Sequence, residues 1–177
     1  YNDKRIYECL KKLNSLSFRN NLKIIVQDSS SPIDIQDKIK SYLNENDIFY
    51  SKKDKGIFDG INILLDLIDT KYFTWIGCDD FIDEDYDYTS VFSLLENGAD
   101  IVQTNVIYFV YSIKNVTRRI TAYNNNFFKY SLGVPFYHFG STIRTSLIRD
   151  NSLKFEIEKR TAADFEFFRK LLKVSKN

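Results

Sequence analysis

Five carboxylates crowd into residues 78–85, directly after the largely apolar run 72–77. Carboxylates packed this closely repel one another unless solvent, a bound cation or a proton relieves them. A hard divalent cation such as Mg²⁺ or Mn²⁺ takes oxygen ligands, often one or two carboxylates with phosphate oxygens and water. The pair Asp79-Asp80 is therefore either an exposed acidic turn or a site for a metal–diphosphate complex.

A second acid, Asp28, ends the β-branched run 23–27 in the same way. Ligands of open α/β sheets bind beyond the carboxyl ends of the parallel strands. If the runs 23–27 and 72–77 are strands of one parallel sheet, Asp28 and Asp79-Asp80 emerge at the same edge. The sequence then predicts that two distant segments converge on one cleft.

The turn at 52–59 carries three lysines and a glycine before a predicted helix. Lys55 and Gly56 could approach a phosphate near the helix N-terminus. Asp59 stands in the first helical turn, where the helix dipole favours a negative charge. A solvated turn explains these residues equally well, so both interpretations stay open.

Two further residues could take part in chemistry, His138 and Asp164. His138 is the only histidine and lies in an aromatic stretch, where it is either a packed side chain or a ligand contact. Asp164 opens the last predicted helix, either as a first-turn acid that stabilises the helix or as a general base. A soft-metal site would require clusters of His or Cys, which the sequence lacks.

The elements that must position these residues alternate along the first hundred residues. Periodicity and turn residues predict helices at 4–16, 34–44, 57–68 and 88–96 and strands at 23–27, 48–51, 72–77 and 99–104. Such alternation indicates parallel pairing with right-handed crossovers. Beyond residue 105 we expect antiparallel strands at 106–113 and 116–123, a loop at 130–137 and a helix at 162–172.

The composition limits the classes of function. A chain of 177 residues that is 44% hydrophobic can bury one sizeable core, so we expect one domain over residues 1–177. Its 25 basic and 24 acidic residues give no general attraction to nucleic acid or to anionic membranes. A negatively charged ligand must therefore be held by a local site.

Cysteine use and hydropathy indicate the setting. Cys9 and Cys78 form no Cys-x-x-Cys or Cys/His pattern, which argues against a disulfide framework or structural zinc and favours a reducing, cytoplasmic setting. Apolar runs such as 106–111 are far shorter than a bilayer span, so we expect a soluble chain. The sequence contains no Met, which indicates that it is not a complete translated product.

Taken in order, these pieces resemble the inverting family 2 glycosyltransferases of the GT-A fold, particularly the short bacterial enzymes that build capsule, lipopolysaccharide O-antigen and other surface glycans. The match runs over nearly the whole chain. The segments that match the family's motifs are Tyr1-Asn2, Glu8-Cys-Leu-Lys-Lys-Leu-Asn-Ser-Leu16, Val26-Gln-Asp-Ser-Ser30, Ser51-Lys-Lys-Asp-Lys-Gly-Ile-Phe-Asp-Gly-Ile-Asn62, Gly77-Cys-Asp-Asp80, His138, Ser141-Thr-Ile-Arg-Thr-Ser-Leu147 and Ala162-Ala-Asp-Phe-Glu166.

The resemblance implies an α/β, Rossmann-like three-layer sandwich with a mainly parallel central sheet, whose first strand would precede Tyr1. The nucleotide-sugar part would occupy about residues 1–104 and the acceptor side about 105–177. It also implies roles for nine residues. Tyr1, Asp28, Lys55, Gly56, Asp59 and Asp79 would bind the nucleotide-sugar donor, Asp80 would bind the metal, Asp164 would be the catalytic base and His138 would contact the diphosphate or the acceptor.

The activity that the resemblance implies is transfer of a sugar from a nucleotide-diphospho-sugar, first of all a UDP-sugar, to an acceptor hydroxyl with inversion. The cofactor would be Mn²⁺ or Mg²⁺. The acceptor would be a glycan or lipid-linked glycan, reached in the cytoplasm or in peripheral association with the inner face of the cell membrane. No nucleic acid partner is expected, and the oligomeric state stays open.

Four positions depart from the family's pattern. Gln27, Ser29, Gly77 and Ala163 stand where relatives often have Asp, Gly, Asp and Glu. These departures leave a second hypothesis open, a module that binds nucleotide-sugars without catalysis. A third, a nucleotidyltransferase on a similar sheet, would usually show a Gly-rich phosphate loop near the first strand, a region that precedes this sequence.

Overall fold

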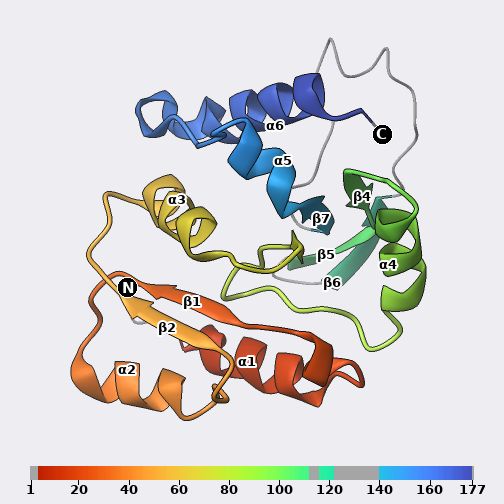
Figure 1. Cartoon of the computed structure of the whole chain (residues 1–177). Coiled ribbons are helices and arrows are strands. Elements are labelled where there is room, and N and C mark those ends of the chain that lie inside the picture. Colours follow the sequence, from red (N-terminus) through yellow and green to blue (C-terminus); the bar gives the residue numbers. More distant parts are fainter. Residues whose placement is uncertain (1–3, 112–115, 122–139, 177) are drawn as a thin grey trace.

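The computed structural model describes residues 4–111, 116–121 and 140–176, and within these the side chains outside 107–111 and 116–121. Helices cover both faces of central strands (Figure 1). No helix in this described part is long and apolar enough to cross a membrane.

The first half of the fold is a βαβ arrangement with one helix before it. Helix α1 (Arg5–Ser15) is followed by strand β1 (Ile25–Asp28), helix α2 (Ile33–Lys40) and strand β2 (Ile48–Ser51). Strands β1 and β2 pair in parallel, with Ile25 opposite Ile48 and Asp28 opposite Ser51. Both strands therefore end at the same edge, as the alternation of elements predicted.

The apolar side of α1 explains why this helix packs beneath β1 and β2. Cys9, Leu10 and Leu13 recur at helical spacing and are all buried, together with Ile39 of α2. Both helices lie on the same side of the β1–β2 pair (Figure 1).

The second half of the fold has a different sheet. Strand β3 (Tyr72–Phe73) and strand β4 (Ile101–Gln103) each pair antiparallel with β7 (Ser141–Arg144), which lies between them. The sequence predicted a longer strand at 72–77 in one parallel sheet with 23–27. Among the described residues, β1 and β3 belong to separate sheets, and β3 is only two residues long because its pairing with β7 ends at Phe73.

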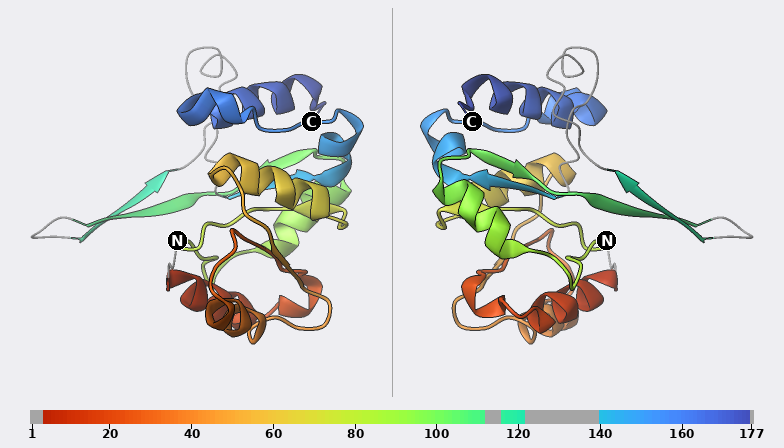
Figure 2. Two further views of the ribbon diagram at one scale, coloured as in Figure 1. Left: turned by 90° about the vertical axis from the view of Figure 1, so that its left-hand side faces the viewer. Right: turned by 90° about the vertical axis from the view of Figure 1, so that its right-hand side faces the viewer.

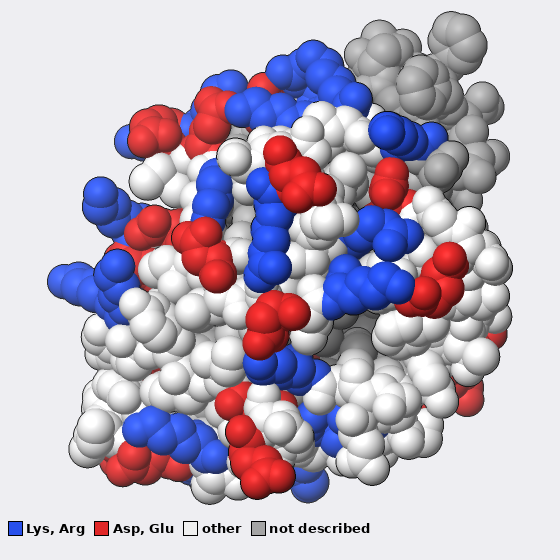
Figure 3. Space-filling model, in the orientation of Figure 1, with Lys and Arg blue, Asp and Glu red and all other residues white. Residues whose placement is uncertain are grey.

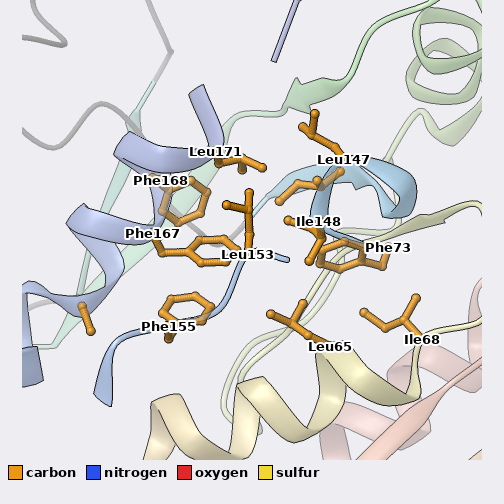
Figure 4. Close-up of a cluster of buried hydrophobic side chains, with 12 residues drawn as sticks. Leu65, Ile68, Phe73, Leu147, Ile148, Leu153, Phe155, Phe167, Phe168 and Leu171 are labelled. Carbon is orange, nitrogen blue, oxygen red and sulfur yellow. The ribbon is translucent and has the colours of Figure 1, made fainter. Parts of the chain in front are cut away.

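A second group of helices covers the opposite face of the strands. It consists of α3 (Ile57–Leu67), α5 (Thr145–Asp150) and α6 (Ala163–Val174), while α4 (Tyr88–Glu96) packs beside β4. Their largest core cluster combines aliphatic side chains with four phenylalanines, and Phe155 and Phe167 stack with ring centroids 4.0 Å apart (Figure 4). Burial of these apolar side chains stabilises the layer.

Strands β5 (Val106–Tyr111) and β6 (Val116–Thr121) form the predicted antiparallel pair. Figure 2 shows this pair extending away from the helices and the other strands. Its register, with Val106 opposite Thr121, confirms that the chain leaves parallel connectivity after β4.

The predicted elements agree with the structure in kind. Helices α1, α3, α4 and α6 and strands β1, β2 and β4 all lie where the pattern placed them, although α2 ends at Lys40 rather than at residue 44. The sequence did not predict β7, α5 or the 3₁₀ helices η1 (Arg19–Asn21) and η3 (Ile157–Ala162). The predicted loop 130–137 lies outside the described residues.

Candidate functional site

Asp28 is held at the shared edge of β1 and β2. Its side chain is buried, and its Oδ2 accepts hydrogen bonds from the Ser31 backbone N–H at 2.9 Å and from the Ser51 hydroxyl at 2.7 Å. Burial alone would raise the pKa of Asp28, but the hydrogen bonds from Ser31 and Ser51 hold that pKa below its ordinary value. Asp28 is therefore an ionised, oriented acceptor at neutral pH.

The lysine-rich turn joins Asp28 through the backbone. The Lys52 N–H donates to the Asp28 carbonyl at 2.9 Å, as a continuation of the β1–β2 pairing. The Lys55 N–H donates to Asp59 Oδ2 at 2.9 Å, and the Gly56 N–H donates to Asp54 Oδ1 at 3.0 Å. Because both of these N–H groups serve carboxylates of the chain itself, a phosphate at this turn would depend on exposed lysine side chains such as Lys55.

Gly56 and Asp59 each have a structural reason to be where they are. The φ of Gly56 is +126°, a backbone conformation that favours glycine. Asp59 lies in the first turn of α3, where its carboxylate meets the Lys55 N–H. The turn geometry thus explains these two residues without a ligand and leaves the Lys55 ammonium free to face solvent.

The acidic pair lies in a tight turn a few residues after β3. The Asp80 N–H donates to the Gly77 carbonyl at 3.0 Å, and the Gly77 N–H donates to Asp80 Oδ2 at 3.1 Å. A Cβ on residue 77 would lie 2.7 Å from Asp80 Oδ2 and 3.0 Å from Asp79 Oδ1. Gly77, which departs from the family's first acid, is therefore what allows the Asp80 carboxylate to fold back onto the backbone.

One face of α1 supports this turn. Arg5, Cys9 and Lys12 recur at helical spacing. The Arg5 guanidinium lies 2.9 Å from Asp79 Oδ2, the Cys9 Sγ lies 3.8 Å from the Gly77 carbonyl oxygen, and the Lys12 Nζ lies 3.4 Å from the centre of the Phe81 ring. These contacts hold the acidic pair against the first helix of the chain.

The pKa of the Cys9 thiol depends on burial and on the charges near this contact. Burial, together with the neighbouring Asp80, Cys78 and Asp79, raises the pKa of Cys9 to about 11. A thiol with so high a pKa stays protonated and is a poor nucleophile. Cys9 is therefore a packing residue of the turn, and both cysteines are free, as the sequence predicted.

The acidic turn fits a metal that shares its ligands with a diphosphate. Over the described ranges, no group of three or more His, Cys, Asp or Glu side chains could hold an ion alone. Asp79 and Asp80 offer hard oxygen ligands, and Arg5 already pairs with Asp79. The donor set therefore suits one Mg²⁺ or Mn²⁺ ligated by Asp80 and by phosphate oxygens.

Asp164 lies in the first turn of α6, where the sequence placed it. It is half-buried, and its Oδ1 accepts the Phe165 N–H at 2.7 Å. Ala163 and Phe167 on either side are almost fully buried and anchor the turn in the aromatic core. The contacts that the structure describes for Asp164 include neither Asp79 nor Asp80.

A network of charges fastens η3, the segment before Asp164, onto α6. Lys159 lies 3.1 Å from Glu156 and 3.8 Å from Glu166, and Lys170 pairs with Glu156. Arg169 forms a bidentate ion pair with Glu166, and its hydrogen bonds lower the pKa of Glu166 to about 2. The network fixes the entry of the chain into the turn that carries Asp164.

Two of the predicted site residues, Tyr1 and His138, lie outside the described residues. Conversely, sequence reasoning missed Arg5, Ser51 and the structural reason for Gly77. No local pattern in the sequence signals that Arg5 would contact Asp79. Ser51 ends the predicted strand 48–51, so parallel pairing with the strand before Asp28 was a signal for it, and the observed register places it opposite Asp28.

The fold is similar to that of solved structures of S. aureus TarS. It is similar to the crystal structure of S. aureus TarS, with a TM-score of 0.71, 19% identity and coverage of 99% of this chain and 32% of that one. For S. aureus TarS 1-349 in complex with UDP-GlcNAc, the TM-score is 0.71 at 20% identity, covering 100% of this chain and 52% of that one. The complex of the same TarS fragment with UDP gives 0.69 at 18% identity, with 99% and 53% covered.

The chain spans about a third to a half of these TarS chains, and at such identities the likeness concerns the fold. Among curated proteins, no sequence matches the chain. The description that matches is "Glycosyl transferase family 2", over residues 1–172. That match covers almost the whole sequence, and the chain therefore belongs to glycosyl transferase family 2.

Proposed function

We propose that this chain transfers a sugar from a nucleotide-diphospho-sugar, first of all a UDP-sugar, to an acceptor hydroxyl with inversion at the anomeric carbon. The single observation that carries the proposal is the acidic turn at Asp79 and Asp80, which helix α1 contacts through Arg5. This turn lies in a chain that belongs to glycosyl transferase family 2. The UDP and UDP-GlcNAc complexes of TarS support the choice of donor.

The donor would lie along the edge where β1 and β2 end. Asp28, fixed by Ser31 and Ser51, would accept a hydrogen bond from the base or ribose. Asp59 would keep the lysine-rich turn in place, Lys55 would face the diphosphate, and Asp79 would contact the ribose or sugar. Tyr1 and Gly56 would complete the donor site, as the family resemblance implies.

Asp164 would act as the general base. It would take the proton of the acceptor hydroxyl while the oxygen attacks the anomeric carbon from the side opposite the diphosphate. The bond from that carbon to the diphosphate oxygen breaks, the leaving group keeps the electron pair, and the configuration inverts. Mn²⁺ or Mg²⁺ held by Asp80 would neutralise charge on the departing diphosphate.

The biological acceptor that we propose is a glycan or lipid-linked glycan of capsule, lipopolysaccharide or another surface polymer. The two free cysteines fit a reducing, cytoplasmic setting. In the face shown in Figure 3, Lys and Arg side chains alternate with Asp and Glu, a distribution that does not favour a nucleic acid. His138 would contact the diphosphate or the acceptor.

Calorimetric titration with UDP, GDP, CDP and dTDP, each with and without Mn²⁺, tests the proposal. We expect UDP to bind in a metal-dependent manner and Asp80→Asn to lose at least tenfold in affinity. Glu84→Gln removes one charge from the same acidic stretch and serves as the matched control, which should bind like the parent chain. Absence of binding by all four nucleotides would refute the transferase proposal.

Activity assays carried out beside these titrations separate the alternatives. A chain that binds UDP but neither hydrolyses nor transfers UDP-sugars would be a nucleotide-sugar binding module, the hypothesis that Gln27, Gly77 and Ala163 motivated. A chain that releases pyrophosphate from a nucleoside triphosphate and a sugar phosphate would be a nucleotidyltransferase.

A further inference from the structure

We infer that a hollow beside the acidic turn is the subsite for an uncharged, hydroxyl-rich sugar of the acceptor, an inference that rests on the proposed function. The hollow has a volume of about 520 Å³ and lies between residues 83–87, helix α4 and the end of β4. Such a volume falls within the range of small-molecule sites.

The position of the hollow suits an acceptor. Its wall begins at Asp83, three residues after Asp80, and continues to Asn105, two residues beyond the end of β4. Strands β3 and β4 run in the same direction, since both are antiparallel to β7. The hollow therefore lies towards the edge of the sheet at which ligands of α/β folds bind, beside the turn proposed for the metal and diphosphate.

Several polar groups around the hollow already serve the fold. Asp87 caps α4 by accepting the Ser90 N–H at 3.1 Å and the Ser90 hydroxyl at 2.5 Å. The Thr104 hydroxyl donates to the Gly140 carbonyl at 3.0 Å. These side chains shape the wall and already have hydrogen-bond partners within the fold.

Three other polar side chains in the wall keep hydrogen-bonding capacity for a ligand. The Asp83 carboxylate accepts the Asp85 N–H at 3.0 Å through Oδ1, and within the described residues its Oδ2 stays available. The Asp85 carboxylate and the Asn105 amide make no hydrogen bond within the described part of the chain, and both residues are exposed. Two carboxylates and an amide can together accept and donate hydrogen bonds to neighbouring hydroxyls.

The floor of the hollow is apolar. Val91 and Val102 are buried beneath it, while Leu94 of α4 is 54% exposed and adds a large aliphatic side chain to the lining. A sugar ring presents C–H groups on its faces and hydroxyls at its edge. The aliphatic floor would contact the C–H groups of the ring face. The carboxylates and the amide at the rim would form hydrogen bonds with the hydroxyls at the ring edge.

The charge of the rim excludes other occupants. Over the described residues, the carboxylates here do not form a group that could hold a metal ion. A phosphate or uronic acid would meet like charge from Asp83 and Asp85, which repels it. Anionic sugars are therefore excluded. We favour an uncharged sugar over an amine-bearing one because the aliphatic floor of Val91, Leu94 and Val102 offers no partner to an ammonium group.

Nuclear magnetic resonance titration of the ¹⁵N-labelled chain tests this inference. The probes are the methyl glycosides of glucose, galactose and N-acetylglucosamine, with glucuronic acid as the anionic comparison and glucosamine as the cationic one. We expect at least one neutral glycoside to shift the amide signals of Asp85 and Asn105, and glucuronic acid to bind at least tenfold more weakly. UDP is titrated separately and should shift Asp28 and Ser51.

Variants make the test specific. Leu94→Glu should abolish the glycoside shifts because it places a charge on the apolar floor, and Asp85→Asn should weaken binding at least threefold. Glu84→Gln lies in the same loop, outside the lining of the hollow, and should leave the shifts unchanged. Each variant should retain the unfolding temperature of the parent chain within about 2 °C, since Leu94, Asp85 and Glu84 are exposed.

Each outcome decides the inference. Glycoside shifts that are absent, or that survive Leu94→Glu, overturn it even when UDP binds normally, and preferential binding of glucuronic acid or glucosamine overturns the neutral ligand. Glycoside binding that persists in a chain unable to bind UDP would instead count against the proposed function and leave the sugar subsite standing.

Discussion

The Arg5 guanidinium and the Asp79 carboxylate, 74 residues apart in the sequence, meet at 2.9 Å on the surface of the protein. Both side chains are about half exposed or more, so the ion pair adds little to stability. Its position matters more than its energy, because it neutralises Asp79, the acid next to the proposed metal ligand Asp80.

Arg5→Ala should therefore tighten binding of Mn²⁺ measured without nucleotide. Freeing the Asp79 carboxylate removes a competing cation, and the expected gain is about three- to fivefold, which corresponds to the free energy of an exposed ion pair. The free energy of unfolding should change by less than about 1 kcal/mol. Electron paramagnetic resonance of free Mn²⁺ measures the affinity.

Lys11→Ala is the matched control for Arg5→Ala, since Lys11 is an exposed cation of the same helix. It should leave Mn²⁺ affinity unchanged. Equal effects of both variants would mean that only the net charge of the chain matters and that the contact with Asp79 does not.

Gly77→Ala should weaken metal-dependent UDP binding strongly while lowering the stability of the fold only slightly. The new Cβ would lie 2.7 Å from Asp80 Oδ2, so the carboxylate must move away from the Gly77 N–H. Since this neighbour is the end of a side chain, we expect a loss of only about 1 kcal/mol of stability. Metal-dependent UDP binding should fall at least tenfold, as measured by calorimetry.

Gly98→Ala tests the opposite behaviour. Gly98 has a φ of +103° and an open environment, so its substitution strains the backbone without touching the acidic turn. It should lower the unfolding temperature and spare UDP affinity. If Gly77→Ala also spared UDP affinity, the position of the Asp80 carboxylate against the Gly77 N–H would have no role in binding.

Glu166 should titrate far below an ordinary glutamate. Hydrogen bonds from Arg169 lower the pKa of Glu166 to about 2, whereas its ordinary value is 4.5. Because the folded-state pKa is the lower one, the stabilisation is present above pH 4.5 and is lost as the pH falls towards 2. Carbon-detected magnetic resonance of the Glu166 carboxyl measures the midpoint directly.

Arg169→Gln should return the Glu166 midpoint towards its ordinary value and should flatten the loss of stability between pH 4.5 and pH 2. Lys173→Gln removes a cation from the last turn of the same helix and should leave the midpoint where it is. A titration midpoint near pH 4.5 for the Glu166 carboxyl in the parent chain would contradict the bidentate ion pair with Arg169.

Asp164→Asn should abolish sugar transfer while sparing UDP affinity, because asparagine cannot accept the proton of the acceptor hydroxyl. The amide keeps the shape of the side chain and the hydrogen bond from the Phe165 N–H. Steady-state assays with UDP-sugars, beside calorimetry with UDP, measure the two properties. Asp150→Asn, at an exposed site, is the control, and retained turnover in Asp164→Asn would remove it as the base.

Local patterns were enough to predict most elements and several site residues. The alternation of apolar and turn residues located helix α4 at Tyr88–Glu96 and strand β2 at Ile48–Ser51. It also placed Asp28 at a strand end and Asp164 in a first helical turn. Such features depend on neighbours in the sequence, and hydrophobic periodicity records them directly.

Pairing between distant segments was beyond local patterns. Strand β7 enters between β3 and β4 from about 40 residues later in the chain and runs antiparallel to both. Among the described residues β1 and β3 therefore do not share the single parallel sheet that was predicted. The sequence also gave no sign that α1 would bring Arg5 to Asp79. Strand order is decided by which faces bury together, and many orders are compatible with the same alternating pattern.

The sequence by itself determined the kinds of elements, the acids at their ends and the family to which the chain is similar. Each of these depends on the types and spacing of residues that are close together in the sequence. Only the tertiary structure decided which acids are oriented and by what. It placed Ser51 against Asp28, gave Gly77 its reason beside Asp80 and shaped the hollow next to α4. Those outcomes depend on distances between segments that only packing of the core brings together.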